Sequence, residues 1–156
     1  MRLPERVVTK SHQSHRAWDL NLDSDNPGEF SVYVRVNVRL PESFSIGLRY
    51  RAERGPLNVI LRINGDHGSH TNPDGFIMDG AHVHMPNGVQ LQAWLPASPW
   101  SQGPPFAAPL GVGFLTLVDA WEILATSTSI ENTDDVRSTV VKVQNKIASA
   151  QLEISL

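Results

Sequence analysis

Four of the six histidines in this 156-residue chain lie close together in two short motifs. His67 and His70 fall within the glycine-containing stretch 65–75, and His82 and His84 form a His-x-His pair further along. Side chains at positions i and i+2 of a strand point the same way, roughly 6–7 Å apart. Imidazole titrates near neutral pH, and it also binds zinc, copper, nickel or iron. These residues therefore predict either proton transfer or metal binding.

Of proton transfer and metal binding, metal binding is the alternative interpretation. A divalent transition metal would be held by His82, His84 and either His67 or His70. A cupin-type site would place a glutamate shortly after His-x-His, but the residues there are MPNGVQLQAW. The chain also has no His-Glu-x-x-His motif. The sequence therefore predicts no cofactor, and the metal is kept as an alternative.

Arginines favour a different chemistry. The net charge is −3, yet the stretch 32–62 holds only two acidic residues and six arginines: Arg35, Arg39, Arg49, Arg51, Arg54 and Arg62. Cleavage of a phosphodiester without a metal needs a base, an acid and cations that stabilise the transition state. In RNA the 2′-hydroxyl is the nucleophile, so the protein needs no serine or cysteine. The leading hypothesis is a small metal-independent nuclease with RNA as its favoured substrate.

This hypothesis gives each candidate residue a role. The catalytic residues, with acid/base work assigned first to the His-x-His pair, are His82, His84, His67 and His70. The substrate-binding residues, which would hold phosphate, position the nucleotide or stack on a base, are Arg62, Asn64, Arg49, Arg35 and Tyr33.

A second function class stays open beside the enzyme. Arginines on an exposed strand face are ordinary, because something polar must face water and because charge discourages edge pairing. His-x-His also occurs by chance. Under this second hypothesis, the chain is a non-catalytic binding module of a bacterial or phage complex of the toxin–antitoxin type, with a protein partner such as an antitoxin.

Strand periodicity positions these residues. Apolar and polar residues alternate over 29–40, 44–51 and 59–64, and more weakly over 76–85, where Asp79-Gly80 interrupts the pattern. The short connections favour antiparallel hairpins. If the apolar residues of all four strands share one face, the opposite face carries Arg35, Asn37, Arg39, Arg49, Arg51, Arg62, Asn64, His82 and His84.

The remaining segments complete the predicted fold. A short helix is suggested over 10–20, and a fifth strand over 89–95. Thr116 is expected to cap a helix with apolar residues at helical spacing, and another helix is expected after residue 132. The prediction is an α+β fold with an antiparallel four- to five-stranded meander and two C-terminal helices on its apolar face.

Composition limits the class of protein. Length predicts a single domain, 1–156, with a polar N-terminal segment 1–28 and a proline-rich loop 96–113. The absence of cysteine excludes disulfides and thiolate chemistry and favours a reducing compartment, which we take to be the cytoplasm. The chain offers no signal-peptide pattern and no apolar run long enough to span a bilayer, so no membrane partner is expected.

The histidine stretch also resembles a family of small bacterial and phage proteins of unknown function. Their shared pattern is Arg-x-Asn-Gly-x-His, then His-x-Asn, then His-x-His, followed by a helix similar to LVDAWEIL. The matching positions here are Arg62, Asn64, Gly65, His67, His70, Asn72, His82 and His84. The resemblance covers about residues 30–130. It implies a bacterial or mobile-element origin and supplies no activity.

Overall fold

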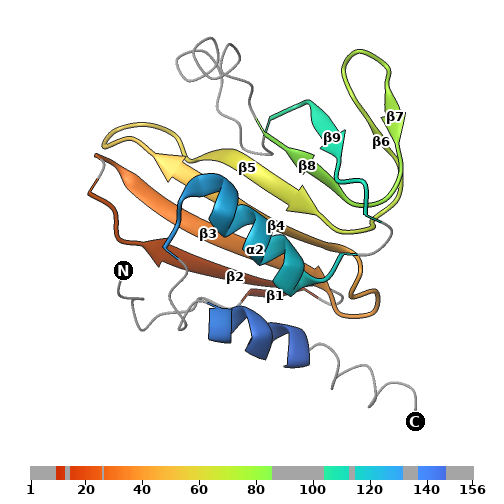
Figure 1. Ribbon diagram of the computed structural model, residues 1–156. Helices are drawn as coiled ribbons and strands as arrows, with labels where there is room; N and C mark the ends of the chain where they lie inside the picture. The colour runs from red at the N-terminus through yellow and green to blue at the C-terminus, as the bar shows by residue number, and fades with distance from the viewer. Residues whose placement is uncertain are drawn as a thin grey trace.

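An antiparallel sheet dominates the computed structural model, which describes residues 10–12, 15–25, 27–85, 104–112, 115–131 and 137–146. Within these residues the sheet has seven strands, in the order β1 (Lys10–His12), β2 (His15–Leu22), β3 (Glu29–Asn37), β4 (Phe44–Arg51), β5 (Asn58–Asn64), β8 (His82–His84) and β9 (Ala107–Pro109). A separate hairpin, β6 (His70–Thr71) and β7 (Ile77–Met78), is inserted between β5 and β8 (Figure 1).

One face of the sheet is apolar, as the alternation predicts. The register aligns one buried residue from each of five neighbouring strands: Trp18, Val34, Ile46, Ile63 and Val83. These residues belong to a single hydrophobic cluster with the helices. A one-residue slip of any strand would move its whole apolar set to the other face, so this shared burial fixes the register.

Two helices cover the apolar face, which confirms the predicted α+β arrangement. Helix α2 (Leu117–Thr128) crosses the sheet and buries residues at helical spacing, Leu117, Ala120, Trp121, Leu124 and Ala125 (Figure 1). Thr116 and Asp119 form a capping box at its start, as expected for the N-cap position. The helical segment 137–146 adds Val140 and Val143 to the same core.

The sheet is wider than expected because two strands lie where the sequence predicted other structure. The segment suggested as a helix over 10–20 forms β1 and the start of β2, because its backbone pairs with β3 and buries Trp18 and Leu20. Residues 107–109, inside the proline-rich loop, form β9 along the edge of β8. The fifth strand expected over 89–95 lies outside the described residues.

Two details of the predicted strands also differ. The expected strand 76–85 is split: Ile77 and Met78 pair with β6, and only 82–84 joins the main sheet. Between Leu48 and Arg49 of β4 the pairing with β5 shifts register, so that Ile60 of β5 is an extra residue and Val59 lies opposite Arg49. Val59 is therefore buried on the polar face, not in the hydrophobic core as its alternation predicted.

No helix within the described residues combines the length and the apolar character needed to cross a membrane.

Candidate functional site

The polar face of the sheet brings the candidate residues together in two cross-strand rows. Neighbouring positions in the first row, from β3 to β8, are Tyr33, Gly47, Arg62 and His84. Neighbouring positions in the second row are Arg35, Ser45, Asn64 and His82. Directly paired residues in a sheet have Cβ atoms about 4.5–5.5 Å apart, so each histidine lies next to one polar residue of β5.

Backbone carbonyls fix the rings of the His-x-His pair. His82 Nδ1 lies 2.8 Å from the Gly80 carbonyl oxygen, and His84 Nδ1 lies 2.8 Å from the Pro104 carbonyl oxygen. A carbonyl only accepts hydrogen bonds, so each Nδ1 carries a proton and donates it. In the neutral ring, the lone pair is then on Nε2 for both histidines.

Each Nε2 lone pair accepts a hydrogen bond from the adjacent residue of β5. Asn64 Nδ2 lies 3.0 Å from His82 Nε2, and Arg62 Nη2 lies 2.8 Å from His84 Nε2. The arginine is always charged and can only donate, so this contact requires His84 to be neutral. The two contacts fulfil the expectation that the histidines share a face with Arg62 and Asn64.

Burial keeps both histidines uncharged. His82 is 0% exposed and His84 is 1% exposed. Burial, together with the adjacent Arg62 cation, lowers the pKa of His84 to about 3. Burial is also the largest cause of the lowered pKa of His82. At neutral pH neither ring carries the second proton that a general acid must give up, so the general-acid part of the role expected for them does not fit their surroundings.

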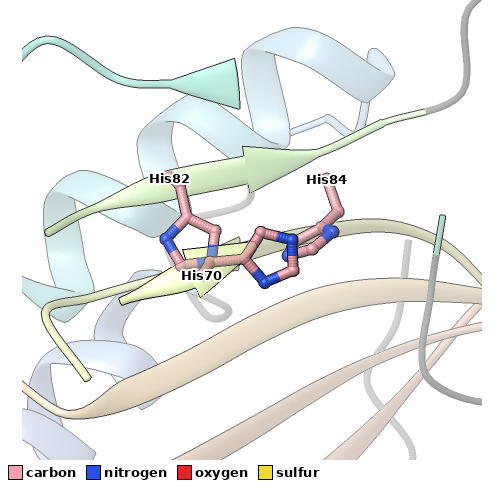
Figure 2. A group of neighbouring side chains, drawn as sticks. All are labelled: His70, His82 and His84. Atoms are coloured by element: carbon pink, nitrogen blue, oxygen red, sulfur yellow. The ribbon is translucent and has the colours of Figure 1, made fainter. Parts of the chain in front are cut away.

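His70 completes a cluster of three imidazoles. Its ring stacks on the His82 ring with the centroids 5.1 Å apart, and it forms a T-shaped pair with the His84 ring with the centroids 4.7 Å apart. One nitrogen of each of the three residues lies within 4.8 Å of the other two (Figure 2). His70 Nε2 is buried and has no hydrogen-bond partner within the described part of the chain.

His67 lies against this cluster but is not one of the three residues whose ring nitrogens converge. Its ring meets the edge of the His82 ring with the centroids 5.0 Å apart, and its side chain is exposed. Of the two loop histidines, the structure therefore brings His70 to the His-x-His pair and leaves His67 at its solvent side.

The β6–β7 hairpin that carries His70 is held in place by Asn72, which the sequence indicated only as part of the His-x-Asn motif. Asn72 Nδ2 donates to the Ala107 carbonyl at 2.9 Å, and Asn72 Oδ1 accepts from the Ala107 N–H at 2.9 Å. This paired contact ties the hairpin to β9, the strand next to His84. The His-x-Asn spacing could have indicated this role of Asn72. A side chain two residues from His70 lies close enough to anchor the strand that carries His70.

Loss of this anchor should loosen the hairpin. We expect Asn72→Ala to raise the hydrogen-exchange rate of the β6–β7 amides about tenfold, because two partly buried hydrogen bonds are lost. Hydrogen exchange followed by mass spectrometry measures this, with Thr71→Ala as the matched control because Thr71 is exposed. Equal exchange in Asn72→Ala and wild type would show that Asn72 does not anchor the hairpin.

The arginines form a second group on the same face. Arg49 Nη1 pairs with Asp19 Oδ1 at 2.7 Å, and the Arg49 guanidinium lies 4.3 Å from the centre of the Tyr33 ring. Tyr33 is 5% exposed, and its hydroxyl lies 3.3 Å from Ser45 Oγ. The expected stacking of a base on Tyr33 does not fit this burial, because Gly47 and Arg49 already lie against the ring.

A cavity of about 310 Å³ connects the two groups. Its described lining includes Arg35, Arg49 and Arg62 together with Asn64 and His67. Arg62 and Asn64 therefore contact the histidine cluster on one side and the cavity on the other.

No protein-family model, curated protein or solved structure matches this chain. The resemblance suggested by the histidine motifs therefore stays a prediction.

Proposed function

We propose that this protein binds a divalent transition metal through His70, His82 and His84. The observation that carries the proposal is the convergence of three imidazoles whose nitrogens lie within 4.8 Å of one another. The neutral state of His82 and His84 supports it, because a metal ligand must be a neutral imidazole with a lone pair. Ligand nitrogens bind zinc at about 2.0–2.1 Å, so a modest contraction of the cluster would suffice.

The hydrogen bonds around the cluster support the same proposal. Metal-binding histidines usually donate their other ring N–H to a carbonyl or carboxylate, which fixes the tautomer and the ring. His82 and His84 donate in this way to Gly80 and Pro104, each over 2.8 Å. The buried His70 Nε2 lacks a partner among the described residues, and a bound metal would supply one.

Three histidine ligands leave one position of a tetrahedral zinc for water or a substrate. The exposed His67 and the arginine-lined cavity lie beside the three histidines on the polar face. We propose zinc as the first metal to test, because imidazole suits zinc and none of the three residues offers the hard oxygen ligand that magnesium or calcium prefers.

Zinc should stabilise the folded protein. A ligand at 100 times its Kd adds about 2.7 kcal/mol, and each kcal/mol raises the Tm of a chain of this size by about 2–4 °C. We therefore expect zinc to raise the Tm of chelator-treated, untagged protein by about 5–10 °C. Differential scanning calorimetry with and without one equivalent of zinc measures this rise in Tm. The variant His70→Ala should lose most of it.

The matched control is His15→Ala. It removes another histidine of the polar face, one that lines the cavity and lies outside the cluster. A zinc-dependent rise that is unchanged in His70→Ala, or absent from the wild type with both zinc and nickel, would refute the metal site.

Metal-independent cleavage of RNA stays a prediction from the sequence. The arginines that line the cavity favour phosphate binding, whereas the neutral state of His82 and His84 favours metal ligation over the donation of a proton. Membership of a toxin–antitoxin-like complex likewise stays a prediction.

A further inference from the structure

The cavity beside the histidine cluster has the charge of an anion site. Its described lining carries three arginines and two histidines, with no acidic side chain: Arg35, Arg49, Arg62, His15 and His67. Asp19 neutralises Arg49 from outside this lining. Arg35 is exposed and has no ion-pair partner among the described residues. Positive charge is therefore left in excess at the cavity.

The size and the donors of the cavity indicate what kind of anion it suits. About 310 Å³ lies at the small end of the range for ligand pockets, which run from about 300 to 1,000 Å³. Guanidinium forks bind tetrahedral phosphate through paired hydrogen bonds, and arginines from three neighbouring strands line the cavity. A carboxylate has only two oxygens and would leave more of these donors without a partner.

We propose that this cavity binds a phosphate group, with Arg35 and Arg62 as direct donors, and that metal at the histidine cluster tightens the binding. The first part rests on the cavity alone. The second part rests on the proposed function, since it needs a metal at His84.

Arg62 provides the link between the two sites. Its Nη2 now donates to His84 Nε2 at 2.8 Å. His84 Nδ1 already donates to Pro104, so Nε2 is the nitrogen left to bind a metal. A metal would take the lone pair on Nε2, and this Nη2 donor of Arg62 would lose its acceptor. The guanidinium already lines the cavity, so a phosphate oxygen there can replace the lost acceptor.

Isothermal titration calorimetry with inorganic phosphate tests both parts. The protein is compared after chelator treatment and after loading with one equivalent of zinc and removal of the excess. We expect the phosphate Kd to fall at least fivefold on zinc loading, which is the lower end of typical coupling between two sites. Arg35→Gln should raise the Kd roughly tenfold in both forms, because a charged hydrogen bond is lost.

Matched variants and probes make the result specific. Arg54→Gln removes the same charge from an exposed turn outside the cavity and should leave the Kd unchanged. Arg35→Lys should retain part of the affinity, because charge remains while the fork is lost. Titration with AMP distinguishes a phosphate ester, which would bind more tightly than inorganic phosphate, from the free anion. Malonate binding more tightly than either would overturn the assignment to phosphate.

The outcomes separate this proposal from the metal site. Zinc binding without phosphate binding, or phosphate binding that Arg35→Gln does not weaken, overturns the proposal and leaves the metal site intact. Phosphate binding that depends on Arg35 in a protein that binds no zinc supports the cavity and refutes both the metal and the coupling.

Discussion

Trp121→Ala should lower the free energy of unfolding by about 3–5 kcal/mol, the usual cost of removing a buried tryptophan. Trp121 is 0% exposed and belongs to the single cluster that joins α2 to the sheet. Its neighbours Leu117, Ala120 and Leu124 are buried along the same side of the helix. A domain of ordinary stability has only about 5–15 kcal/mol in total, so this change could remove half of it.

Urea denaturation followed by circular dichroism measures this loss. The matched control is Ile123→Ala, in the same helix, where the side chain is only half-buried. We expect that control to cost well under half as much, since less apolar surface leaves water at that position. Equal losses in the two variants would mean that Trp121 does not hold α2 on the sheet.

The apolar face could be predicted because alternation carries over from strand to strand. Phe30, Val32 and Val34 continue one pattern over a long strand, and the short turns that follow favour hairpins. Once the apolar sets are placed together, the polar face follows without further information. This reasoning predicts Arg62, Asn64, His82 and His84 on one surface, and the pairing of β5 with β8 places them there.

The missing strands had no such pattern. In β2 only Trp18 and Leu20 are buried, so its sequence does not alternate for long enough to indicate a strand. Strand β9 is Ala-Ala-Pro, which has little strand propensity and exists because β8 offers a free edge. The extra residue Ile60 could not be predicted either, because the residues of β5 alternate as if the strand were regular.

The chemistry of the histidines depends on burial, which the motif does not reveal. His-x-His is compatible with proton transfer when the rings are exposed and with metal binding when they are buried and neutral. The decisive contacts come from Gly80, Pro104 and Asn72, which have no titratable side chain and were given no role in the site by the sequence. The sequence therefore predicts which histidines share a face, whereas their charge state depends on the tertiary structure.

Gly47→Ala should damage the arginine cavity while sparing the histidine cluster. A Cβ at Gly47 would lie 2.5 Å from Tyr33 Cε1 and 2.6 Å from the Leu61 carbonyl oxygen. The backbone oxygen cannot move freely, so the Tyr33 ring must shift, and with it the Arg49 guanidinium that lies against the ring. We expect a loss of about 2–3 kcal/mol in stability, as for other overpacked sites, and a phosphate Kd raised roughly tenfold.

Calorimetric titrations of the same variant with zinc and with phosphate give the comparison, and Gly55→Ala is the matched control. Gly55 lies in a turn where a Cβ would come no closer than 3.3 Å to Ala52, so that variant should stay within about 1 kcal/mol of wild type. Zinc affinity should be unchanged in Gly47→Ala, because His70, His82 and His84 lie on β6 and β8. If zinc and phosphate affinity fall together, the two sites are one structural unit; if phosphate affinity is unaffected, Tyr33 does not position the arginines.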